Sequence, residues 1–157
     1  MRGLARGWIL GAAISLHGAS VHAATELAWA KADEIDGEHS TAALISWTGH
    51  EREFRGWRWQ PEVLAGVIQG RPEAEVRARH DVHFAGYGTR VLLGDFYIGS
   101  GLILIDQQSS ILSSVGQFVS SVGWSRGHWR ITLRHLSNAN THGENRGENL
   151  LSIGYAW

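Results

Sequence analysis

The sequence predicts an all-β fold, an eight-stranded antiparallel transmembrane β-barrel of the outer-membrane type. Three observations favour it. Apolar and polar residues alternate with a period of two over much of the chain, as in strands with two different faces. The 157 residues include eight tryptophans and no cysteine, and tryptophan prefers the bilayer interface. The sequence ends at Trp157 in an alternating strand, a feature typical of bacterial outer-membrane barrels.

The first 23 residues resemble a removable secretory signal peptide. Arg2 and Arg6 form a basic start, and the apolar stretch WILGAAISL that follows is too short to cross a bilayer. Small residues then surround a cleavage point after Ala23. The sequence therefore predicts that residues 1–23 are removed and that residues 24–157 form a single barrel domain.

Eight strands are expected in the mature part, each between two clusters of turn-forming residues. Their approximate ranges are Glu26–Lys31, Ser40–Thr48, Phe54–Gln69, Val76–Val91, Gly94–Asp106, Ser113–Trp124, His128–Ser137 and Asn149–Trp157. In the seventh, Trp129, Ile131 and Leu133 share one face, and arginines and a threonine share the other. In a membrane barrel the first face meets lipid and the second lines a filled interior.

Charge argues against a nucleic-acid partner, and the spacing of the histidines argues against a metal site. Residues 24–157 contain 12 Lys and Arg against 15 Asp and Glu, and Lys31 is their single lysine. A nucleic-acid partner is therefore not expected, because no basic run could follow a phosphate backbone. No metal site is predicted, since His80 and His83 would lie on opposite faces of a strand.

A group of polar residues precedes the last strand and has the composition of a hydrolytic site. His135 and Ser137 are two residues apart, so their side chains share a face, and that face also carries Leu133. A histidine near a serine can take the hydroxyl proton and so create a nucleophile. Because the same face meets lipid, the expected substrate is a lipid. A polar hairpin loop without chemistry is the alternative interpretation of the same residues.

The segments HLSNA at 135–139 and NRG at 145–147, followed by an aromatic-ended strand, resemble the signature of the outer-membrane lipid A 3-O-deacylases. This resemblance implies a small eight-stranded barrel that hydrolyses an ester-linked acyl chain of lipid A, without a cofactor. It assigns the base to His135 and the nucleophile to Ser137. It also matches Asn138 to the asparagine that follows the serine, and it matches Asn145 to an oxyanion ligand. Backbone N–H groups near Ala139 and Asn140 would assist Asn145.

The third member of the expected triad has two candidates. The family has a glutamate at the position that aligns with Asn149, and Glu148 is the adjacent residue. Alternation favours Asn149, which shares the face of Trp157, whereas negative charge favours Glu148. An asparagine can still orient a histidine, although it supplies no charge.

Two other functions fit the same fold. One is a non-enzymatic outer-membrane barrel with a structural or adhesive role, and the other is an outer-membrane phospholipase. The expected partners are lipid A or lipopolysaccharide, the surrounding membrane lipid and, in a homodimer, a second copy of the chain.

Overall fold

The computed structural model describes residues 23–34, 39–71, 80–109, 111–141 and 147–157. Nearly all of the predicted signal peptide lies outside these ranges. The strands are β1 (Ala24–Glu34), β2 (His39–Thr48), β3 (Arg52–Phe54), β4 (Trp57–Ile68), β5 (Val82–Leu93), β6 (Phe96–Ile105), β7 (Gly116–Arg126), β8 (Trp129–Ser137) and β9 (Glu148–Ala156). Within the described ranges, no helix is long and apolar enough to cross a membrane.

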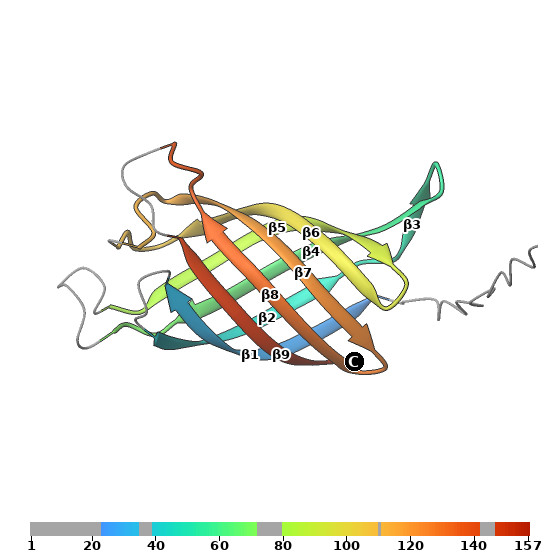
Figure 1. Ribbon diagram of the computed structural model, residues 1–157, viewed down its shortest axis with the longest axis horizontal. Coiled ribbons are helices and arrows are strands. Elements are labelled where there is room, and N and C mark those ends of the chain that lie inside the picture. Colours follow the sequence, from blue (N-terminus) through green and yellow to red (C-terminus); the bar gives the residue numbers. More distant parts are fainter. Residues whose placement is uncertain (1–22, 35–38, 72–79, 110, 142–146) are drawn as a thin grey trace, which may run out of the picture.

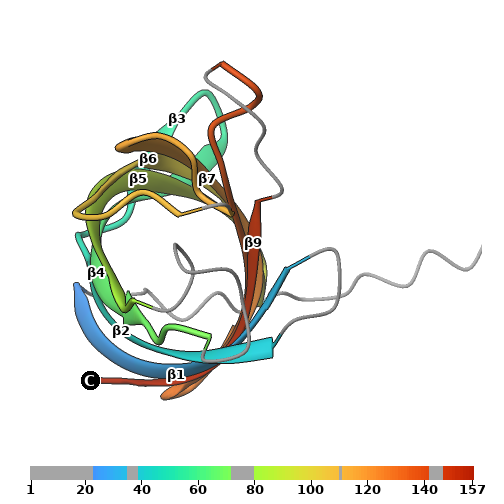
Figure 2. The same cartoon turned by 90° about the vertical axis from the view of Figure 1, so that its left-hand side faces the viewer.

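Eight of these strands form a closed ring in which every neighbouring pair is antiparallel (Figures 1 and 2). The order runs from β2 through β1, β9, β8, β7, β6 and β5 to β4, and pairing of β4 with β2 closes the ring. Strand β3 adds a short hairpin to the start of β4. Closure pairs the backbone of both edge strands, so no open sheet edge remains in the ring. The predicted eight-stranded antiparallel barrel is confirmed.

Two predicted strands differ clearly from the described ones. The expected strand Phe54–Gln69 is interrupted, because Arg55 and Gly56 adopt left-handed φ values of 52° and 81° and form the turn between β3 and β4. Two residues with positive φ are typical of a tight hairpin turn. Residues 76–79 of the expected strand Val76–Val91 lie outside the described residues, and the described strand begins at Val82, after Asp81, which accepts a hydrogen bond from the backbone of Gly70 at 2.9 Å.

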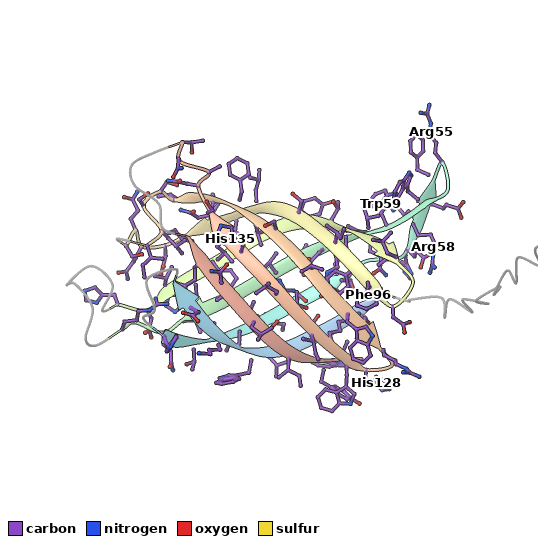
Figure 3. All side chains as sticks on the ribbon, viewed as in Figure 1. Arg55, Arg58, Trp59, Phe96, His128 and His135 are labelled. Atoms are coloured by element: carbon purple, nitrogen blue, oxygen red, sulfur yellow. The ribbon has the colours of Figure 1, made fainter. Side chains whose placement is uncertain are left out.

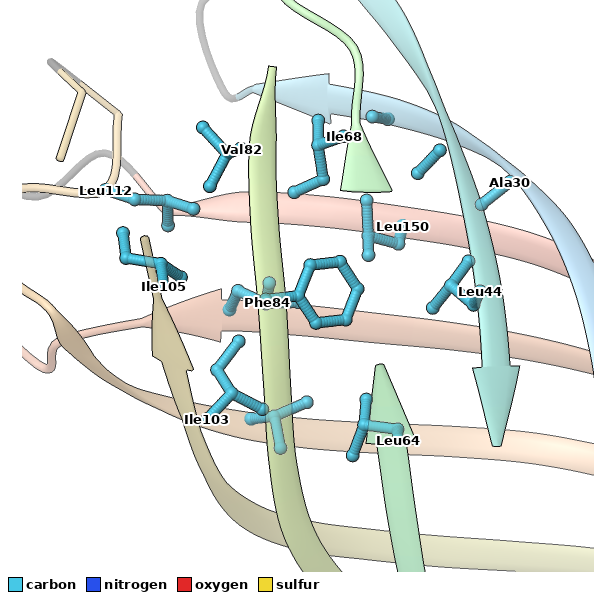
Figure 4. Close-up of a cluster of buried hydrophobic side chains, with 14 of the residues drawn as sticks. Ala30, Leu44, Leu64, Ile68, Val82, Phe84, Ile103, Ile105, Leu112 and Leu150 are labelled. Carbon is cyan, nitrogen blue, oxygen red and sulfur yellow. The ribbon is translucent and has the colours of Figure 1, made fainter. Parts of the chain in front are cut away.

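Alternation divides the side chains between the outside and the inside of the barrel. The outer surface carries exposed apolar side chains on every strand of the ring, among them Trp29, Ile45, Val63, Tyr87, Ile98, Val122, Ile131 and Ile153. The inner side is filled. One half contains an apolar cluster that includes Leu44, Leu64, Phe84 and Ile103 (Figure 4).

The other half of the interior contains buried ion pairs. Arg90 donates from Nε to Glu62 at 2.9 Å, and Arg134 donates from Nη2 to the same carboxylate at 3.1 Å. Arg130 donates to Glu26 at 3.1 Å. These oppositely charged side chains pair inside the barrel, as buried charges usually do, although Oε1 of Glu26 has no hydrogen-bond partner among the described residues.

The two ends of the barrel differ. Short turns at Gly94–Asp95 and Gly127–His128 lie at the end where β9 finishes, which we call the terminus end (Figure 1). The described parts of the longer connections lie at the opposite end, which we call the loop end; they are residues 69–71, 80–81, 106–109, 111–115, 138–141 and 147. In outer-membrane barrels the short turns are periplasmic and the long loops are extracellular.

Candidate functional site

His135 and Asn149 lie directly opposite each other on β8 and β9. Their side chains form a hydrogen bond of 2.9 Å between Nδ1 of His135 and Oδ1 of Asn149. Because the amide oxygen accepts, Nδ1 is the donor, and in the neutral imidazole the lone pair is then on Nε2. Both residues have the same strand parity as the outward-facing leucines beside them, Leu133 and Leu151. His135 therefore lies on the outer surface, near the loop end (Figure 3).

Ser137 is the last residue of β8 and is half-buried on the same face as His135. Two residues of a strand separate the Cα atoms of Ser137 and His135 by about 7 Å. The backbone N–H of Ala139 donates to Oγ of Ser137 at 3.0 Å. The serine is thus placed at the point where the strand becomes a loop, with a backbone donor beside its oxygen.

The loop after Ser137 is held by Asn138, which is fully buried. Its Nδ2 donates to Ser113 at 3.0 Å, and its Oδ1 accepts the N–H of Asn140 at 2.8 Å. Ala139 and Asn140 adopt left-handed φ values of 54° and 57°. Asn138 therefore positions the loop from inside. Of the two expected backbone donors, the N–H of Ala139 points to Ser137, and the N–H of Asn140 is bonded to Asn138.

Glu148 points to the opposite side of the barrel wall from His135. It is buried, and its carboxylate accepts a hydrogen bond of 2.7 Å from Nη2 of Arg71. Both side chains line a small pocket at the loop end, together with Ile68, His80 and Ile111. The geometry pairs Asn149 with His135, whereas Glu148 pairs with an arginine of the interior.

Gly147 is a site residue whose role sequence reasoning missed. Its φ is +73°, and a Cβ at this position would lie 2.6 Å from Cε1 and 3.1 Å from Nε2 of His135. The glycine backbone therefore packs directly against the Cε1–Nε2 edge of the imidazole ring. The one sequence feature that could have indicated this role is the position of Gly147 directly before an alternating strand. Glycine is common in loops, so this feature is weak.

Asn145, the expected oxyanion ligand, lies outside the described residues. Within the described ranges, no group of three His, Cys, Asp or Glu residues could hold a metal ion.

Polar side chains extend sideways from His135 along one row of the barrel wall. Cross-strand pairing places Ser120 of β7 beside His135, Asn149 beside Asp33 of β1, and Asp33 beside His39 of β2. Nδ1 of His39 lies 3.0 Å from Oδ1 of Asp33. Towards the terminus end the wall becomes apolar, with Leu133 and Leu151 exposed. On β8 and β9 the row thus marks the end of the apolar band, whereas on β7 Phe118 is still exposed beyond it.

The sequence matches no protein-family model, and no curated protein is significantly similar to it. A solved structure is similar in fold. It is the outer membrane enzyme PagL, with a TM-score of 0.50 and 16% sequence identity. The similarity covers 83% of this chain and 97% of that chain. At this level of identity the comparison shows a shared barrel fold.

Proposed function

We propose that this protein is an outer-membrane hydrolase that removes an ester-linked acyl chain, at the 3-O position, from lipid A. The observation that carries the proposal is the hydrogen-bonded pair of His135 and Asn149 on the outer wall, with Ser137 on the same face. An active centre that faces lipid receives its substrate from within the membrane. The similarity in fold to the outer membrane enzyme PagL and the HLSNA motif support the same function.

The position of the site along the barrel supports a glycolipid headgroup as substrate. Ionisable side chains on a lipid-facing surface are unfavourable and are usually functional. Here they lie at the border of the apolar band and the loop end, where sugar–acyl ester bonds of lipid A would be found. The loop end is the extracellular end in barrels of this type, and lipopolysaccharide occupies that leaflet.

The reaction would proceed by serine acyl transfer. Nε2 of His135 takes the proton of Ser137, and Oγ attacks the acyl carbonyl carbon. The tetrahedral intermediate collapses when the imidazolium returns this proton to the sugar oxygen, which leaves as a hydroxyl group. Water, deprotonated by His135, then releases the fatty acid from the serine ester.

The other residues would have supporting roles. Asn149 holds the Nδ1 proton and so keeps Nε2 available as the base, but it adds no negative charge to stabilise the imidazolium. The N–H of Ala139, which donates to Oγ of Ser137, would turn to the oxyanion once this oxygen has attacked the carbonyl. By resemblance, Asn145 would provide a second donor.

Expression in a Gram-negative host tests the proposal. Mass spectrometry of the lipid A should show loss of one acyl chain with the wild-type protein. Ser137→Ala and His135→Ala should each abolish this loss, since a triad nucleophile or base contributes about 10⁶-fold to turnover. Heat-modifiable migration on a gel would show that each variant has folded and inserted.

Ser120 provides a matched control, because it is an exposed outward serine whose backbone pairs with His135. Ser120→Ala should retain full activity. Loss of activity in Ser120→Ala with retention in Ser137→Ala would reassign the nucleophile. Unchanged lipid A with a folded wild-type barrel would favour a structural or adhesive role.

A further inference from the structure

The segment REFRGWRW at residues 52–59 has no role in the proposed hydrolysis. It forms the hairpin of β3 and the start of β4, which extends beyond the ring at the terminus end (Figure 1). Phe54 pairs with Trp57, and Arg52 pairs with Trp59. Phe54 and Trp57 are 65% and 60% exposed, respectively. Large aromatic side chains with this exposure indicate a contact surface.

The hairpin has two chemically different faces, because cross-strand partners share a face. Phe54, Trp57 and Trp59 lie on one face, which we call the aromatic face. Glu53 and Arg58 pair on the other face, where Arg58 also binds Glu51 with 2.7 Å between Nη2 and Oε2. Trp59 and Arg58 lie on opposite sides of the hairpin in Figure 3.

The aromatic face continues the outer wall of the barrel. Trp57 and Trp59 have the same parity in β4 as Val63, which is exposed on the outer surface, whereas Glu62 points inward. The apolar outer wall therefore extends from the ring onto the hairpin without interruption.

Two arginines lie over the rings of this segment. The guanidinium carbon of Arg52 is 5.3 Å from the ring centroid of Trp59, and that of Arg55 is 5.3 Å from the ring centroid of Phe54. Stacking on a ring leaves the N–H groups of a guanidinium free to bind a planar or tetrahedral anion at its edge. Aromatic rings and arginines together fit the headgroup region of a bilayer, where rings lie among glycerol groups and arginines bind phosphates.

We propose that the hairpin of residues 52–59 is an interfacial anchor that binds phospholipid headgroups of the leaflet at the terminus end. Its aromatic face enters the headgroup region, and Arg52 and Arg55 bind lipid phosphates. Lipid is favoured over a second protein copy because the aromatic face is continuous with the apolar wall. This inference needs the membrane barrel of the proposed function and is independent of the hydrolytic chemistry.

Site-directed spin labelling tests the anchor, because the chain contains no cysteine. Phe54→Cys and its neighbour Glu53→Cys place a nitroxide on opposite faces of the same strand. Each labelled barrel is refolded into vesicles of phosphatidylethanolamine and phosphatidylglycerol, and its relaxation by oxygen and by a water-soluble nickel chelate is measured. The label at 54 should be severalfold less accessible to the chelate than the label at 53.

A second comparison tests the arginines. In the Phe54→Cys background, Arg55→Gln should raise chelate accessibility in vesicles containing phosphatidylglycerol, and Arg126→Gln, at a different turn of the terminus end, should leave it unchanged. Equal chelate accessibility at 53 and 54 would overturn the anchor. A second copy of the chain would give a different result: spin–spin broadening at high protein density, and protection at 54 that disappears when the protein is diluted in lipid. That result would also overturn the anchor.

Discussion

Gly147→Ala is the substitution that tests the geometry around His135 most directly. The added Cβ would lie 2.6 Å from Cε1 and 3.1 Å from Nε2 of the imidazole, and 3.1 Å from the backbone oxygen of Leu136. Non-bonded carbon atoms prefer a separation of about 3.5–4.0 Å, so the ring would have to retreat by about 1 Å. A displacement of this size at a reacting group lowers turnover by about 10²-fold.

The substitution also affects stability, because alanine in the left-handed region costs about 1–2 kcal/mol. Two other glycines separate this effect from the loss of geometry. Gly56 and Gly127 have φ values of +81° and +59°, and a Cβ at either would meet no other atom within 4 Å. Gly56→Ala and Gly127→Ala therefore carry similar backbone strain without contact with His135.

The assay is turnover of purified lipid A in detergent micelles, with folding verified by heat-modifiable migration. We expect kcat of Gly147→Ala to fall about 10²-fold, and kcat of both control variants to stay near the wild-type value. If all three variants had the same kcat, the packing of Gly147 on His135 would have no catalytic consequence, and the assignment of the base would lose its structural support.

Asn149→Asp should raise kcat about tenfold, since a carboxylate there would stabilise the imidazolium, whereas Asn149→Leu should lower it; unchanged turnover in both would exclude the residue from the triad. Glu62→Ala should destabilise the barrel by about 3–5 kcal/mol, because it leaves two buried arginines without this partner, and urea titration in micelles would measure it against Glu53→Ala as an exposed control. Deleting Trp157 should reduce membrane-inserted protein without changing export, as seen in fractionated immunoblots, because its backbone exchanges two hydrogen bonds with Thr25 at the β1–β9 seam; normal insertion would contradict this.

Alternation made much of the fold predictable. In a strand the side chains alternate between faces whatever the strand pairs with, so residue parity alone indicates that Leu133, His135 and Ser137 share the outer surface. The expected number of strands in the ring agrees with the structure for the same reason. The break at Arg55 and Gly56 was missed although the aromatic residues change parity there, from Phe54 to Trp57 and Trp59, and this change was the available signal.

The candidate site was predictable in its residue types and faces, but not in its contacts. Parity placed Asn149 on the face of His135, and charge favoured Glu148. Only the register of β8 with β9 shows that Asn149 lies beside the imidazole. The carboxylate of Glu148 is bound by Arg71, which is 77 residues away along the chain.

By itself, the sequence determined most of the strands, their outward and inward faces and the group of residues that could carry acyl-transfer chemistry, because these depend on spacing within one strand. The tertiary structure decided the partners of each charged or polar side chain, from Glu26 with Arg130 to His135 with Asn149. It also decided that the aromatic hairpin extends beyond the ring. Such pairings depend on the stagger between strands that closure of the barrel imposes, and that stagger is a property of the whole ring.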